Sequence, residues 1–233
     1  MSYLELIKAL RLQKNPEKIA VFKRFFKTGK DEYGEGDRFF GLTTPVMVTV
    51  ALRFRALALT DLAKLLAHPV HECRAAALVI LKKQFLKADA NGRKKITDFY
   101  LRYAQRINNW DLVDISAPLI LANLDWSTRL RLAKSKNLWE RRMAMMSTFA
   151  GIKAHHFAPT LDLARLLLHD PHDLIHKAVG WLLREVGKRD LAVETAFLNK
   201  YATRMPRTML RYAIEKFPQS LRQHYLHLKP HVS

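Results

Sequence analysis

The chain has 233 residues, of which 49% are hydrophobic, so it can form an ordered core as one domain or one repeat array. Lys and Arg number 40 against 21 Asp and Glu, and the formal net charge of +19 favours a polyanionic partner, nucleic acid before an anionic membrane. The single cysteine, Cys73, excludes an intramolecular disulfide and a zinc site built from several cysteines.

The first segment of the chain, residues 1–13, predicts an amphipathic helix that lacks the apolar core and cleavage site of a signal peptide. Elsewhere Lys or Arg interrupts the longest apolar stretches, and the sequence carries no lipidation motif. We therefore expect an intracellular, cytoplasmic protein in a reducing compartment, without a membrane anchor.

Apolar residues recur at i, i+3, i+4 and i+7 along almost the whole chain, which is the pattern of amphipathic helices. Asp, Asn, Thr and Pro stand at the joints between these segments, where they supply caps and helix starts. The sequence predicts an all-α protein with helices over residues 16–26, 60–68, 71–86, 92–107, 127–135, 138–150, 160–169, 174–188 and 206–217.

One long irregular stretch, the glycine-rich segment Lys27–Pro45, contains four of the eight glycines. Its composition fits either an ordered loop or a flexible linker. Phe39 and Phe40 favour the ordered loop, because two adjacent aromatic residues gain from burial.

Several of the predicted helices begin with a basic residue that small or apolar residues follow closely. These basic residues are Arg74, Arg142, Lys177 and Arg211, which are 68, 35 and 34 residues apart. A unit of about 34 residues made of two helices is typical of an α-solenoid, in which one edge of every unit lines a continuous wall. The four residues predict a basic stripe on that wall, although each one alone fits an ordinary solvated helix start.

One copy of this unit is missing from the stripe, and the sequence at its expected place reads NNWDLVDISAP, Asn108–Pro118. Trp110 and Asp114 are four residues apart and share one helix face. A carboxylate is costly to bury without a partner, so this pair favours a site over plain core packing. Stacking of the repeats in register predicts that Asp114, Arg142 and Trp181 converge.

Other kinds of site find little support in the sequence. The ten histidines form no HExxH pattern, and their HxxH pairs straddle turns that contain proline, so we expect no metal and no cofactor. We expect these histidines to cap helices or approach phosphates. The run GEGDRFFG is neither a dinucleotide loop nor a P-loop, and no serine or cysteine lies in a nucleophile elbow. The remaining hypothesis is a site whose chemistry depends on a carboxylate, with aromatic and cationic side chains beside it.

Three motifs, INNWDLVDISAP, NLWERRMAM and HKAVGWLLREVGK, resemble those of the bacterial DNA alkylation repair glycosylases of HEAT-like repeat fold, the AlkD type. YGEGDRFFGLTTP is similar to the glycine-rich segment of one branch of that family, and the resemblance runs from about Asn15 to Phe217. It implies a single domain over residues 1–233, folded as an α-α superhelix that cradles duplex DNA. It also implies hydrolysis of the N-glycosidic bond of N3- and N7-alkylated purines, without a deep pocket for an extruded base.

The resemblance assigns residues by motif position. The residues that it implies for the catalytic site are Trp110, Asp114, Arg142 and Trp181. The basic residues that we expect to contact DNA are Arg74, Arg141, Lys177, Arg184 and Arg211. One departure from the family is Val48, which stands where relatives commonly have an arginine after the proline of the GLTTP run.

The implied reaction is chemically consistent with these residue types. An alkylated purine of this kind carries a positive charge and leaves as a neutral base, so no acid catalyst is needed. Asp114 can stabilise the cationic sugar and hold or deprotonate the water. The tryptophan rings favour contact with a cation, and Arg142 suits the neighbouring phosphate.

No lysine stands in the motifs as a Schiff-base nucleophile, so we expect a monofunctional glycosylase without lyase activity. The rival hypothesis is a non-catalytic solenoid that binds nucleic acid or scaffolds an acidic partner. For either function we expect a monomer, because one solenoid with capped ends closes its own core.

Overall fold

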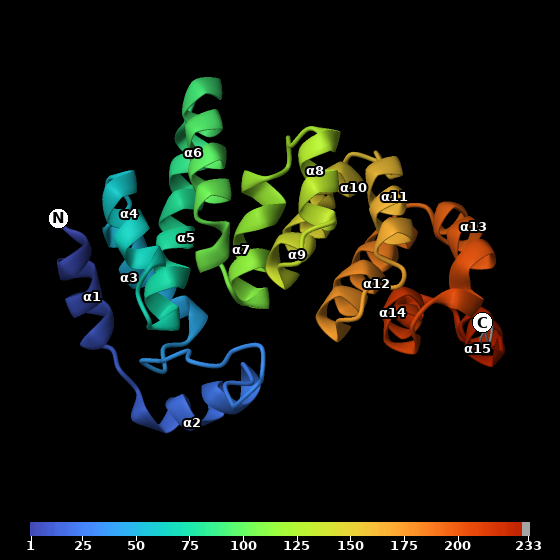
Figure 1. Ribbon diagram of the computed structural model, residues 1–233, viewed down its shortest axis with the longest axis horizontal. Helices are drawn as coiled ribbons and strands as arrows, with labels where there is room; N and C mark the ends of the chain where they lie inside the picture. Colours follow the sequence, from blue (N-terminus) through green and yellow to red (C-terminus); the bar gives the residue numbers. More distant parts are fainter. Residues whose placement is uncertain (230–233) are drawn as a thin grey trace. The chain divides into compact units, whose positions relative to one another are not determined.

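The computed structural model describes residues 1–229, and Figure 1 shows their helices. The chain divides into two compact units, Met1–Ser116 and Ala117–Ser233, and helix α7 (Trp110–Ile120) spans the boundary between them. Successive helices connected by short loops confirm the predicted all-α repeat fold; the one β-bridge in the described part of the chain joins Arg38 to Val70. The single domain over residues 1–233 stays a prediction.

Helix α5 is the centre of unit 1, and α3, α4 and α6 pack against it. Eleven of its 17 residues are buried, including His71, Glu72 and Arg74 in its first turn. Buried charged groups need partners, so this first turn must organise the structure around it. The helices of unit 1 before α7 are α1 (Tyr3–Arg11), α2 (Pro16–Phe25), α3 (Thr44–Arg53), α4 (Leu59–Leu66), α5 (His71–Lys87), α6 (Ala90–Arg102) and the 3-10 helix η1 (Ala104–Arg106).

The glycine-rich segment is ordered, as its aromatic residues predicted. The Glu72 carboxylate accepts hydrogen bonds of 2.8–3.1 Å from the backbone N–H groups of Phe40, Gly41 and Leu42. Gly41 has a φ of +82°, and a Cβ there would lie 2.2 Å from the carbonyl oxygen of Asn15. A glycine is therefore required where this segment crosses the start of α2.

Unit 2 is built around α12, which packs against α9, α13 and α14. Gly180 allows the close approach of α14, because a Cβ at this position would lie 2.3 Å from the carbonyl oxygen of Met209. The elements of unit 2 after α7 are α8 (Trp126–Ala133), α9 (Leu138–Met146), α10 (Phe149–Lys153), α11 (Ala158–Leu166), α12 (Asp173–Gly187), α13 (Leu191–Tyr201), η2 (Ala202–Arg204), α14 (Arg207–Ala213), η3 (Ile214–Lys216) and α15 (Gln219–His227).

The structure differs from the predicted helices in one helix that is divided and in three helices that were not predicted, α3, α13 and α15. The helix predicted over residues 138–150 is two helices, because the hydroxyls of Ser147 and Thr148 donate to the carbonyls of Ala144 and Met145, at 2.7 and 2.8 Å, where α9 ends. Helix α3 was not predicted, because its valines and threonines favour strands by propensity. No helix within residues 1–229 has the length and apolar character needed to cross a membrane.

Glu72→Ala should lower the free energy of unfolding by roughly 3 kcal/mol or more, because it leaves three backbone donors without their charged acceptor. Urea titration at neutral pH measures this change. Glu17→Ala, at an exposed carboxylate in the first turn of α2, is the control and should cost less than about 1 kcal/mol. Equal losses in the two variants would contradict the anchoring role of Glu72.

Candidate functional site

Trp110 and Asp114 lie one turn apart at the start of α7, and both side chains are half-buried. The predicted pair on one helix face is therefore present. Behind it, the hydroxyls of Tyr100 and Ser116 hydrogen-bond at 2.8 Å, and both residues are fully buried. Burial raises the pKa of Tyr100, and the negative charge of Asp114 raises it further.

An aromatic cluster supports the Trp110 ring. Phe26 stacks on it with a centroid distance of 5.7 Å, and Phe39 stacks on Phe26 at 5.4 Å. Phe25 meets Trp110 edge-on at 5.6 Å and is 59% exposed. Phe25 and Phe26, at the C-terminal end of α2, thus contact Trp110 directly, and Phe25 leaves an exposed aromatic ring next to it.

A buried charged cluster, here called the His71 network, connects the glycine-rich segment with the start of α7. It consists of His71, Asp37, Asp111 and Arg74. His71 Nδ1 lies 3.2 Å from Asp37 Oδ2, and its Nε2 lies 2.8 Å from Asp111 Oδ2. Arg74 donates to the second oxygen of Asp37 at 2.6 Å. Because both ring nitrogens of His71 face carboxylates, both must donate, so the ring is an imidazolium.

The charges in this network shift the pKa values of its members. Burial lowers the pKa of His71, but the Asp111 and Asp37 carboxylates outweigh it and raise the pKa to about 9. Burial raises the pKa of Asp37, yet the His71 hydrogen bond and the Arg74 charge bring it below its ordinary value. The network therefore holds two positive and two negative charges at neutral pH.

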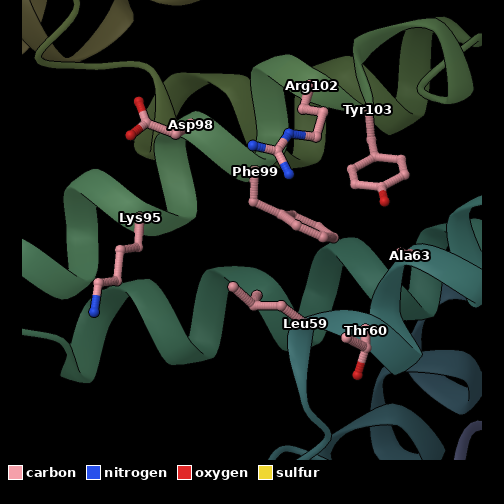
Figure 2. Close-up of a pocket in the computed structure, with 8 residues that line it drawn as sticks. All are labelled: Leu59, Thr60, Ala63, Lys95, Asp98, Phe99, Arg102 and Tyr103. Atoms are coloured by element: carbon pink, nitrogen blue, oxygen red, sulfur yellow. The ribbon is translucent and has the colours of Figure 1, made fainter.

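Two clefts lie in unit 1. One of about 290 Å³ borders the His71 network and is lined by Asp37, Arg74 and the loops around them. The other, of about 360 Å³, lies between α4 and α6, and Figure 2 shows the rings of Phe99 and Tyr103 among its lining residues. The second cleft contains none of the predicted site residues, and the first contains Arg74 but neither Trp110 nor Asp114.

In unit 2, Arg142 and Trp181 lie on α9 and α12. Arg142 is 4% exposed, and its NH1 group donates to the carbonyl oxygen of Leu174 at 2.5 Å. Trp181 is half-buried and its ring contacts Phe149 at 5.8 Å. Arg142 therefore has a hydrogen-bond partner, Leu174, in the first turn of α12. Its role in the catalytic site stays a prediction.

The basic stripe needs one correction, which concerns Arg74. Asp114, Arg142, Lys177 and Arg211 are each the fifth residue of their helices, whereas Arg74 is the fourth residue of α5. Arg74 NH1 donates to the carbonyl six residues earlier, as Arg141 NH1 does, and His176 Nε2 bonds to the equivalent carbonyl. Arg74 is 5% exposed and ion-paired, so its predicted place in a solvent-facing stripe is wrong.

Three other basic residues predicted to contact DNA have acidic partners. Arg141 forms a two-pronged pair with Asp170, at 2.6 and 3.3 Å, and donates to two backbone carbonyls. Arg184 pairs with Glu215. Lys177 also pairs with Asp173, at 2.7 Å, but both of these side chains are well exposed. Arg211 is exposed on α14. The accessible cations of the fifth-residue position are therefore Lys177 and Arg211.

Several histidines of the described residues act within the fold, and the sequence predicted helix capping for part of them. His172 Nδ1 accepts from the backbone N–H of Leu174 and caps α12, and His68 Nδ1 accepts from Val70 N–H in the turn before α5. In the described part of the chain, no group of three or more His, Cys, Asp or Glu side chains is arranged to hold a metal ion. The bridging role of His71 was not predicted, because Asp37 and Asp111 are 34 and 40 residues away along the chain.

The chain is similar to known proteins both in sequence and in structure. The model of a family described as DNA alkylation repair enzyme matches residues 6–217. Among solved structures, the chain is similar to one described as a predicted DNA alkylation repair enzyme from Enterococcus faecalis. The TM-score is 0.67 at 14% identity, over 88% of this chain and 97% of that chain, which shows a shared fold. No curated protein matches the chain.

The His71 network should make stability depend on pH. The folded-state pKa of about 9 exceeds the ordinary 6.5, so the stabilisation is complete below about pH 6.5 and is lost as the pH rises through 9. The loss should reach roughly 3 kcal/mol. Urea unfolding of the wild-type chain and of His71→Gln, each at several pH values, measures it as the difference between the two curves. A constant difference from pH 6 to pH 10 would contradict the charged state of His71.

Proposed function

The chain belongs to the family of DNA alkylation repair enzymes, and from this we propose that it hydrolyses the N-glycosidic bond of cationic alkylated purines in duplex DNA. One observation carries the proposal. Asp114, one turn after Trp110, occupies the same helix position at which α9, α12 and α14 carry Arg142, Lys177 and Arg211. An acid and an aromatic ring thus replace a cation in a series otherwise suited to phosphates.

Asp114 is the proposed catalytic residue. The departing N3- or N7-alkylated purine is already cationic, so the enzyme has to stabilise positive charge on the sugar and supply water. A carboxylate stabilises that charge directly and can orient or deprotonate the water. Its place one turn into a helix whose first turn is held by the His71 network supports a defined orientation.

Trp110 is proposed to contact the cationic nucleotide through its ring, and the exposed Phe25 adds aromatic surface beside it. Trp181 is also proposed to contact the cationic nucleotide through its ring, as the sequence predicted. Arg142 is proposed to hold a phosphate. Its hydrogen bond to Leu174 supports that role, because a phosphate would meet a guanidinium that is already oriented.

Lys177 and Arg211 are proposed to contact the DNA backbone. The pair between Lys177 and Asp173 is exposed to solvent and therefore weak, so a phosphate can compete for this lysine. Arg74, Arg141 and Arg184 are not included, because their guanidinium groups have carboxylate partners within their own units.

Asp114→Asn should reduce base release by roughly 100-fold or more, because the charge that stabilises the sugar cation is removed while the shape is kept. Single-turnover release of 3-methyladenine and 7-methylguanine from methylated duplex DNA measures this, with duplex affinity measured in parallel. Asp98→Asn, at an exposed carboxylate on α6, is the matched control. Undiminished release by Asp114→Asn would remove the catalytic assignment, and tight binding without release by the wild-type chain would favour a non-catalytic DNA-binding solenoid.

Arg211→Ala should weaken duplex binding and make it less dependent on salt. Loss of one phosphate contact lowers the slope of log K against log salt concentration by about 0.9. Affinity measured over a series of salt concentrations gives this slope. Arg165→Ala removes an equally exposed arginine from α11, outside the fifth-residue position, and should leave the slope unchanged. Equal changes in the two variants would indicate a general charge effect instead of a contact.

A further inference from the structure

His71 has two separate connections to Trp110. Its Nε2 bonds to the carboxylate of Asp111, the residue that follows Trp110 in the first turn of α7. Its ring also packs against Phe26 at 4.7 Å, and Phe26 stacks on Trp110. Both the backbone at Trp110 and one face of its ring are therefore held by groups that contact the same buried histidine.

The other side of His71 is held equally firmly. Asp37 accepts from Nδ1, and the same carboxylate receives Arg74 at 2.6 Å and the Asn109 side chain at 3.4 Å. Asn109 is fully buried and directly precedes Trp110. The residues on both sides of Trp110 in the sequence are thus bonded to partners of His71 or to His71 itself.

We propose that His71 is a positioning residue for the proposed reaction, which orients Trp110 and the first turn of α7, and with it Asp114, toward the nucleotide. This inference rests on the proposed function. His71 does not contact the nucleotide, since it is 3% exposed and both ring nitrogens are engaged by carboxylates. Its effect passes through Asp111 and Phe26.

A purely structural role would lower stability and leave the chemical step unchanged in the molecules that remain folded. A positioning role lowers the rate constant itself, because a small misplacement of a group at the reacting centre can cost up to about 100-fold. Glu72 offers a matched comparison. It is the next residue on α5, equally buried at 3%, and its partners are backbone N–H groups of the glycine-rich segment instead of groups at Trp110.

The test compares His71→Gln, Asp111→Asn and Glu72→Gln in single-turnover base release, at a temperature where each variant is folded by circular dichroism. We expect the first two to lose about tenfold or more in rate constant, with duplex affinity changed less than twofold, and Glu72→Gln to keep its rate constant. Asp111→Asn keeps the test decisive if His71→Gln does not fold, because Asp111 is only partly buried. Unchanged rate constants in both variants would overturn the proposal.

A double-mutant cycle tests whether the effect of His71 on the rate constant passes through Trp110. If His71 acts through Trp110, His71→Gln should have little further effect on the rate constant in a Trp110→Phe background. A full additional loss in that background would overturn action through the Trp110 ring and would leave the Asp111 contact, which holds the first turn of α7 and Asp114, as the route.

The indole N–H resonance of Trp110, assigned with Trp110→Phe, provides a readout that needs no catalysis. It should shift in His71→Gln and stay in place in Glu72→Gln. A shift in a chain whose wild type releases no base would support positioning while the proposed function fails. An unshifted resonance would overturn positioning even where release occurs.

Discussion

The imidazolium of His71 between two carboxylates is the interaction on which unit 1 depends. Burying the charges of His71, Asp37 and Arg74 is costly, and the cost is offset only because the four groups of the network alternate in sign and meet at 2.6–3.2 Å. Three chain segments meet there: the glycine-rich segment through Asp37, α5 through His71 and Arg74, and α7 through Asp111. A loop rich in glycine has high entropy when unfolded, so it needs such charged anchors to adopt one conformation.

The need of buried charges for partners also divides the basic residues near the helix starts into two groups. A step of one residue rotates a helix position by about 100°, so the fourth and fifth residues of a helix point in different directions. At the fourth position, Arg74 and Arg141 donate to carbonyls of the loop before their helix, and each also donates to an aspartate from a distant segment, Asp37 or Asp170. At the fifth position, Lys177 and Arg211 remain accessible, whereas Arg142 is buried and donates to the carbonyl oxygen of Leu174. Part of the positive charge therefore stabilises the repeats, and part is available to a polyanion.

Sequence periodicity was sufficient for the all-α fold and for placing Trp110 and Asp114 on one helix face, because both depend on local spacing. It placed Arg74 in the wrong register by one residue, since a basic residue near a helix start looks the same whether it faces solvent or a loop. It missed α3, whose packing overrides the strand preference of its valines. The His71 network escaped it entirely, because contacts across 34 and 40 residues have no local pattern.

The network also explains how α7 carries two carboxylates so close together. Asp111 and Asp114 are three residues apart, a spacing at which like charges on a helix repel each other. The His71 imidazolium neutralises Asp111 and draws its oxygen into the interior, at 2.8 Å from Nε2. Because the charge of Asp111 is balanced in this way, Asp114, one turn after Trp110, has no second negative charge of full strength beside it. A single, oriented negative charge next to an aromatic ring is what a developing sugar cation requires, so the buried histidine and the proposed chemistry belong to one arrangement.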